Sequence, residues 1–152
     1  MDHFALPDDE LTLAQREGKL QRNFQGYSTH KECDLVGLGV SSIGKIGDCY
    51  AQNLKTIPTW QSAVHAGELP IWRGVTLGTE DRLRRSIIES IMCHGELRCG
   101  EFEQRYGIEF AEHFTPEVQG LNPLEQDGLI EIEAGGFTVT PAGRLLLRNI
   151  AM

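Results

Sequence analysis

The second half of the chain has a helical apolar periodicity, and this pattern restricts the possible folds more than any other feature. From Thr79 onward, apolar side chains recur every three or four residues, for example at Leu83, Ile87 and Ile91, as in a helix with one buried face. Residues 1–78 lack this regularity and are rich in glycine. We therefore expect two parts, 1–78 and 79–152, of which only the second can close its own core.

The second part is predicted to contain three helices, a hairpin and a final helix. Helix-capping residues, prolines and glycines set the boundaries, because they favour the start or end of a helix. The predicted segments are residues 79–94, 102–106 and 115–126 (bent at Pro123), the strands 129–133 and 137–140, and a helix from 141 to 150. This order is typical of a winged-helix-like module, so the predicted fold class is α+β.

The first part is predicted to be irregular and dependent on other structure. Its expected elements are a helix near 9–17, a strand at 34–40, a glycine-rich loop at 41–48 and a helix near 59–66. Gly37-x-Gly39, just before this loop, is similar to the start of a dinucleotide-binding fingerprint, but Ser42 stands where the fingerprint needs its third glycine. A tightly packed loop and a ligand-binding loop both remain open.

Charge argues against a nucleic-acid partner. The chain has a net charge of −8, and residues 79–152 hold 13 acidic and 7 basic residues. Between Pro116 and Gln126, in the helix that would enter a DNA groove, there is no Lys or Arg. Because DNA affinity depends on cations that contact phosphates and bases, we expect no nucleic-acid binding.

The residues show neither a metal site nor a complete catalytic site. The cysteines lie far apart, without the CxxC pairs typical of zinc or iron–sulfur ligands, and the histidines have no HxxH spacing. No apolar run approaches the ~20 residues needed to span a bilayer. We expect no metal and no membrane partner, and a cytoplasmic location. The four cysteines are Cys33, Cys49, Cys93 and Cys99.

Several motifs resemble one enzyme family over nearly the whole chain. They are residues 22–27 (RNFQGY), 37–43 (GLGVSSI), 46–53 (IGDCYAQN), 69–74 (LPIWRG) and 143–150 (GRLLLRNI). They are similar to the C-terminal part of the oxygen-independent coproporphyrinogen III oxidases. These radical S-adenosylmethionine enzymes oxidatively decarboxylate coproporphyrinogen III to protoporphyrinogen IX in haem biosynthesis.

The resemblance also implies what this chain lacks. Family members hold a 4Fe–4S cluster through a CxxxCxxC motif in an N-terminal barrel that also binds S-adenosylmethionine, and no such motif occurs here. We therefore expect the fragment to be inactive alone and to bind neither cofactor. Residues 1–78 would be a barrel-associated segment, an incomplete piece of the α/β barrel region, and residues 79–152 a lid or support.

The missing barrel should leave apolar side chains and strand edges of the first part uncovered. Such surfaces favour self-association. We expect the uncovered side chains to be found among Phe4, Leu35, Val36, Leu38, Val40 and Ile43.

Two residues acquire roles through the resemblance. Ile43 matches a position that contacts a second S-adenosylmethionine, and Gln25 matches one that faces the substrate cavity. The glycines near Ile43 would leave its backbone approachable, and Gln25 offers hydrogen-bond donors and acceptors. From the residues alone, a packed isoleucine and a surface glutamine are equally good readings.

The competing hypotheses are an acidic winged-helix interaction or regulatory module without catalysis, and a DNA-binding regulator. We predict that mixed-sequence duplex DNA added to the chain at physiological salt gives no binding, because the acidic module gains little from counterion release. A fluorescence-anisotropy titration measures this. Salt-sensitive binding at micromolar affinity would support the DNA-binding regulator instead.

Overall fold

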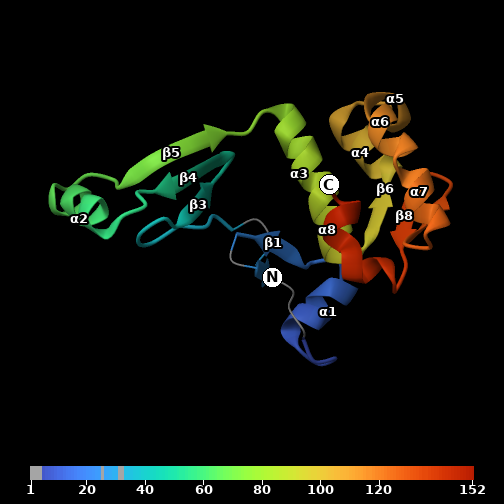
Figure 1. The fold of residues 1–152 in the computed structure, drawn as a ribbon, viewed down its shortest axis with the longest axis horizontal. Helices are drawn as coiled ribbons and strands as arrows, with labels where there is room; N and C mark the ends of the chain where they lie inside the picture. The colour runs from blue at the N-terminus through green and yellow to red at the C-terminus, as the bar shows by residue number, and fades with distance from the viewer. Residues whose placement is uncertain (1–4, 25, 31–32) are drawn as a thin grey trace. The chain divides into compact units, whose positions relative to one another are not determined.

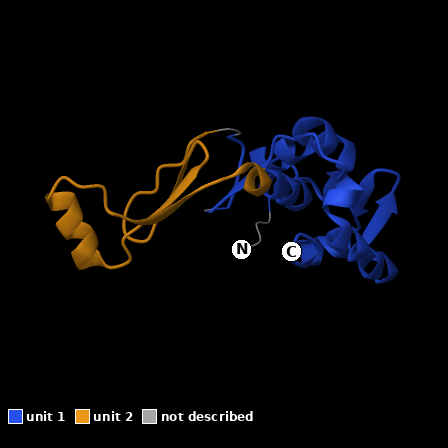
Figure 2. Cartoon of the chain, turned by 90° about the horizontal axis from the view of Figure 1, so that it is seen from above, with its two compact units in different colours: residues 1–31, 83–152 blue, residues 32–82 orange. Residues whose placement is uncertain are grey.

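The computed structural model describes residues 5–24, 26–30 and 33–152, and its strands form three separate antiparallel sheets (Figure 1). Packing divides the chain into two compact units (Figure 2). Unit 1 contains residues 1–31 and 83–152, and unit 2 contains residues 32–82. The expected division at residue 78 rests on the texture of the sequence and stays a prediction.

Unit 2 is a three-stranded sheet with one added helix. The strand order is β3-β4-β5, and all neighbours are antiparallel. The helix connects β4 to β5 and ends before Gly67, whose φ of 75° suits glycine. The elements are β3 (Ile43–Ile46), β4 (Cys49–Asn53), α2 (Ile57–His65) and β5 (Ile71–Thr76).

None of the described residues of unit 2 is fully buried. Every residue of β5 is exposed, and the exposed side chains of the unit include large apolar ones. Val36 is 65% exposed and Leu38 is 85% exposed, in agreement with the prediction of uncovered apolar side chains, whereas Phe4 lies outside the described residues. Unit 2 therefore has an ordered backbone without a hydrophobic core of its own.

Two sequence expectations in unit 2 are wrong. The strand expected at 34–40 does not form, since only Leu35 makes an isolated bridge, to Lys45. The glycine-rich loop expected at 41–48 instead contains β3, which pairs with β4 along its full length. Gly37 and Gly39 explain the first error, because glycine weakens a strand and Gly39 has a φ of 92°.

Unit 1 combines a small N-terminal segment with the periodic second half of the chain. Its helix α3 (Thr79–His94) begins four residues before the unit boundary. The N-terminal segment contributes α1 (Glu10–Arg16), β1 (Gln21–Asn23) and β2 (Gly26–Ser28). The remaining elements are β6 (Glu96–Arg98), α4 (Cys99–Tyr106), α5 (Phe110–His113), α6 (Thr115–Gln119), α7 (Leu121–Gln126), β7 (Ile130–Glu133), β8 (Gly136–Val139), the 3₁₀ helix η1 (Gly143–Leu146) and α8 (Leu147–Ile150).

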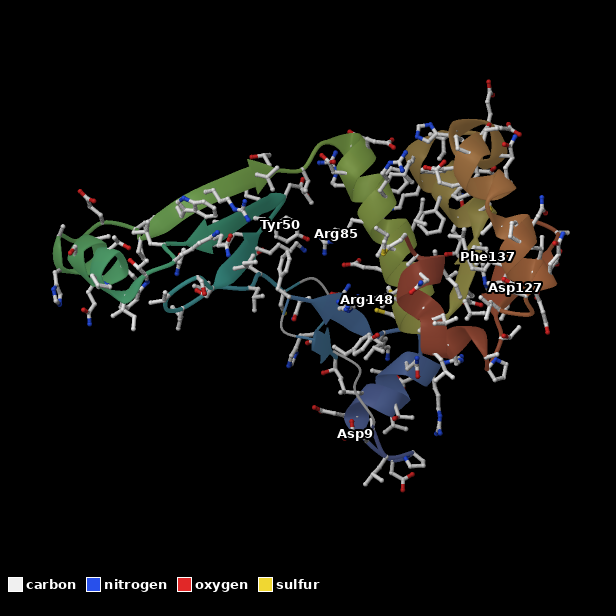
Figure 3. All side chains as sticks on the ribbon, in the orientation of Figure 1. Asp9, Tyr50, Arg85, Asp127, Phe137 and Arg148 are labelled. Carbon is white, nitrogen blue, oxygen red and sulfur yellow. The ribbon has the colours of Figure 1, made fainter. Side chains whose placement is uncertain are left out.

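The core of unit 1 lies between these helices and the sheet β6-β8-β7. Ile130 is 1% exposed and Phe137, labelled in Figure 3, is 3% exposed. Three phenylalanines from α4, α5 and the junction of α5 and α6 belong to the same core, and their tilted rings have centroids 6.4 Å and 4.8 Å apart in successive pairs. The other buried members of this core are Leu83, Ile91, Leu97, Phe102, Phe110, Phe114, Val139 and Ile150.

Most predicted elements of the second half are confirmed, and the differences have local causes. The helix expected at 115–126 divides into α6 and α7 at Gly120, one turn before Pro123. Proline causes this break upstream because its ring clashes with the carbonyl four residues earlier. The helix α5 and the strand β6 were not expected from the sequence, and the helix expected at 141–150 is a 3₁₀ turn followed by α8.

The N-terminal segment packs on α3 through a second small core. Ala14, Leu20 and Cys93 are buried together, and the Gln15 amide donates a hydrogen bond to the Cys93 carbonyl oxygen at 2.9 Å. Burial raises the pKa of the Cys93 thiol to about 12, with a further increase from Glu89 and a smaller opposing effect from Arg22. The Cys93 thiol is therefore protonated at neutral pH, so it serves packing rather than nucleophilic chemistry.

We predict that Ile130→Ala lowers the free energy of unfolding of unit 1 by about 2–5 kcal/mol, because it leaves a cavity in a close-packed core. Ile132→Ala is the matched control on the same strand, where the side chain is 38% exposed, and should cost only about 0.5 kcal/mol. Urea unfolding followed by circular dichroism measures both. Equal losses for the two variants would contradict this packing.

We also predict that amide hydrogens of residues 33–78 exchange faster than those of α3 and β8, since stability follows buried apolar contacts. Hydrogen exchange followed by mass spectrometry on dilute, monomeric protein tests this. Trp60 and Trp72 are the two tryptophans of the chain and both lie in unit 2, so their fluorescence reports separately on that unit. Uniform protection of both units would show that unit 2 is stable alone.

Candidate functional site

Ile43, the residue predicted to bind a cofactor, begins β3 and is half-buried. It pairs with Gln52 of β4, which in turn pairs with Arg73 of β5. Directly paired residues of antiparallel strands project from the same side of a sheet. We call this side the Ile43 face. It consists of Ile43, Lys45, Tyr50 (Figure 3), Gln52, Arg73 and Val75.

The loop before Ile43 is held by Asn53. The Asn53 amide nitrogen lies within hydrogen-bond distance of the carbonyl oxygens of Gly37 at 3.1 Å and Gly39 at 2.9 Å. It also lies 3.1 Å from the Ser42 hydroxyl, which donates to the Gly39 carbonyl at 2.8 Å. One asparagine of β4 thus fixes both glycines and the turn.

Gly37 of this loop and Gly44 of β3 serve close packing of the backbone. A Cβ added at Gly37 would lie 2.8 Å from the Ile43 carbonyl carbon, and one added at Gly44 would lie 2.8 Å from the Leu35 carbonyl oxygen. The chain itself therefore fills the space beside Ile43 that the sequence analysis expected to be open. The tightly packed loop is the better of the two readings. Ile43 as a cofactor contact stays a prediction.

A β-bulge lies beside the Ile43 face. Between the pairs Gln52–Arg73 and Asn53–Ile71, β5 advances two residues while β4 advances one, so Trp72 is the extra residue. A bulge interrupts the alternation of side chains. As a result, the Arg73 guanidinium carbon lies 4.4 Å from the centroid of the Trp72 ring. The bulge has no sequence signature, because a register shift leaves no pattern in the residues.

Two further groups complete this arrangement. The Arg73 Nε donates to the Gln52 side-chain oxygen at 3.1 Å, and the Lys55 Nζ lies 3.9 Å from the Trp72 ring centroid. Neither cation has an ion-pair partner among the residues that the structure describes, whereas Arg82 of the same unit pairs with Asp48 at 2.8 Å. We call Gln52, Lys55, Trp72 and Arg73 the bulge cluster.

Gln25, the residue predicted to face the substrate cavity, lies outside the described residues. The two strands on either side of it, β1 and β2, belong to unit 1, whereas Ile43 belongs to unit 2. The Tyr27 hydroxyl donates to the Met92 carbonyl at 3.3 Å, which ties β2 to α3. The role of Gln25 stays a prediction.

The described residues do not fit an iron–sulfur cluster. Within them, no three His, Cys, Asp or Glu side chains are grouped so that they could hold a metal ion. All four cysteines are free thiols, and burial raises the pKa of Cys99 as well as that of Cys93. No step of a reaction can therefore be assigned to a metal held by these residues.

A pocket in unit 1 carries no candidate site. An open pocket of about 490 Å³ lies around the turn between β7 and β8, and its lining combines Glu96 and Glu133 with Arg98. Arg98 is already paired with Glu96 at 3.1 Å.

In the part of the chain that the structure describes, each helix is too short or too polar to cross a bilayer.

Comparison with known proteins identifies relatives along the whole chain. A family profile described as the HemN C-terminal domain matches residues 77–146. The oxygen-independent coproporphyrinogen III oxidase of Pseudomonas aeruginosa is 50% identical over all 152 residues, and that of Escherichia coli is 47% identical. The chain covers 33% of each of these relatives, so it spans about a third of their length.

A solved structure agrees with these sequence matches. The coproporphyrinogen III oxidase HemN from Escherichia coli, described as a radical SAM enzyme, superposes with a TM-score of 0.94 at 48% identity. All of this chain is matched, against 35% of that structure. Along its whole length the chain is therefore similar to the C-terminal portion of the oxygen-independent coproporphyrinogen III oxidases.

Proposed function

We propose that this chain supplies the C-terminal portion of an enzyme that oxidatively decarboxylates coproporphyrinogen III to protoporphyrinogen IX in haem biosynthesis. The observation that carries the proposal is the match of all 152 residues to a third of the solved Escherichia coli enzyme at 48% identity. The missing core of unit 2 supports it, because a sheet that buries no side chain of its own needs a covering partner. That partner is the barrel of the complete enzyme.

The cofactors belong to the complete enzyme in this proposal. S-adenosylmethionine and a 4Fe–4S cluster supply the radical chemistry there. This chain has no CxxxCxxC motif, so it contributes to binding and positioning rather than to holding the cluster. Alone it is inactive. Its exposed apolar side chains then favour self-association.

Residues 79–152 act as a winged-helix-like support in the same proposal. The order of α3, β6, α4, the divided helix α6–α7 and the hairpin β7–β8 supports this description. Nucleic acid is not its partner. The divided helix carries Glu117, which pairs with Arg84 of α3 at 2.9 Å, and it offers no cation of its own to a phosphate.

A cytoplasmic location is part of this proposal. All four cysteines are free thiols, as is usual in a reducing compartment. The substrate, coproporphyrinogen III, and the absence of a membrane or nucleic-acid partner are proposed together with the reaction.

To test the function, the segment that precedes the matched region in the Pseudomonas aeruginosa relative is fused in front of residue 1, because that relative is 50% identical. We predict that the fusion forms protoporphyrinogen IX anaerobically with S-adenosylmethionine and a reductant, whereas the 152-residue chain alone does not. Product is measured by chromatography after oxidation. A folded, cluster-containing fusion without activity would contradict the proposed function.

The same fusion tests Ile43. We predict that Ile43→Asp lowers turnover and S-adenosylmethionine binding at least about tenfold, since a new carboxylate at a half-buried cofactor contact costs more than ~1.4 kcal/mol in binding. Ile43→Val keeps the apolar branched shape and should remain close to the parent. Circular dichroism confirms that both variants fold. Normal binding and turnover in the Asp variant would rule out this contact.

A further inference from the structure

Two contacts within the bulge cluster restrain the Arg73 guanidinium. Its Nε donates to the Gln52 side-chain oxygen at 3.1 Å, and its central carbon lies over the Trp72 ring, 4.4 Å from the ring centroid. The edge formed by the two Nη groups has no hydrogen-bond partner among the described residues. A guanidinium edge of this kind matches the two oxygens of a carboxylate, and its ordering beforehand reduces the entropy lost on binding.

A second cation lies at the same ring. The Lys55 ammonium is 3.9 Å from the Trp72 centroid, so two positive charges approach one indole. Two cations held at one ring repel each other, and in proteins acidic neighbours usually offset this. Here the chain holds 22 acidic residues against 14 basic ones, yet no described carboxylate pairs with either cation. The arrangement is therefore complementary to an anion.

The surroundings of the two cations favour a carboxylate on an apolar body. Trp72 is 45% exposed, and Val75, on the same face as Arg73, is 56% exposed. A ligand that lies along this surface can bury apolar area while its acidic group meets the guanidinium. Coproporphyrinogen III combines an apolar macrocycle with propionate side chains.

We propose that the bulge cluster binds a propionate of the substrate, with Arg73 as the bidentate partner, Lys55 as the second cation and Gln52 as the residue that positions Arg73. This inference rests on the proposed function. It also places substrate binding on the Ile43 face, next to the proposed cofactor contact. The same carboxylate chemistry has one other source, an Asp or Glu side chain in the preceding part of the complete enzyme.

The first test uses the 152-residue chain and coproporphyrin III, the air-stable oxidised form of the substrate. Quenching of tryptophan fluorescence reports binding, because Trp72 lies in the cluster and Trp60 in the same unit. We expect saturable binding that Arg73→Gln weakens about tenfold or more and Lys55→Gln weakens about threefold. Arg98→Gln, an exposed arginine of unit 1, is the matched control and should leave the affinity unchanged.

A porphyrin of similar size that carries N-methylpyridinium groups in place of propionates tests the charge requirement. The Arg73→Gln variant should bind this cationic porphyrin at least as tightly as the parent chain does. Equal coproporphyrin III affinity in the parent chain and in Arg73→Gln would overturn the proposal. No saturable binding by the parent chain would also overturn it.

The second test uses the fusion with the Pseudomonas aeruginosa segment and distinguishes the two sources of carboxylate. If the substrate binds, Arg73→Gln raises KM about tenfold with unchanged cluster content and thermal midpoint. If a protein carboxylate pairs with Arg73, the variant lowers the thermal midpoint and leaves KM unchanged, which overturns the proposal. An active fusion with an unaffected KM rejects the substrate site alone, whereas an inactive parent fusion rejects the proposed function itself.

Discussion

Burial of apolar side chains occurs in only one of the two units, and the rest of the structure depends on this constraint. Unit 1 closes a core around Ile130 and Phe137, so its helices and sheet can be stable by themselves. Unit 2 buries none of its described side chains, so hydrogen bonds and close backbone packing maintain its sheet. Such a sheet is suited to presenting side chains to a partner or ligand, because its apolar groups are not used for its own core.

Backbone geometry, rather than a recognisable motif, creates the candidate site in unit 2. Asn53 binds the loop carbonyls, and Gly37 packs against the backbone of Ile43. On the neighbouring strand, one extra residue brings Trp72 beside Arg73. Both devices act over a few ångströms between segments far apart in sequence. They explain how a sheet without a core of its own can still hold Ile43 of β3 and Arg73 of β5 in defined positions.

The periodic half could be predicted in large part because its signals are local. Gly95 and Gly107 follow the ends of α3 and α4 with positive φ, and the predicted ends of these two helices agree with the structure. The missed strand β6 is three residues long and exists because β8 pairs with it. The expected strand at 34–40 does not form because Gly37 and Gly39 interrupt it, and its apolar residues Val36 and Leu38 are exposed.

The sequence by itself determined the helical half, the acidic charge, the absence of the cluster motif and the family resemblance, since each depends on residue identity and short-range spacing. Only the tertiary structure decided that residues 5–24 and 26–30 pack with the second half, through Ala14 and Leu20 against Cys93. It also decided that Lys55, Trp72 and Arg73 come together. The physical reason is that strand register and long-range burial are set by the partners a segment meets, and a linear pattern does not specify those partners.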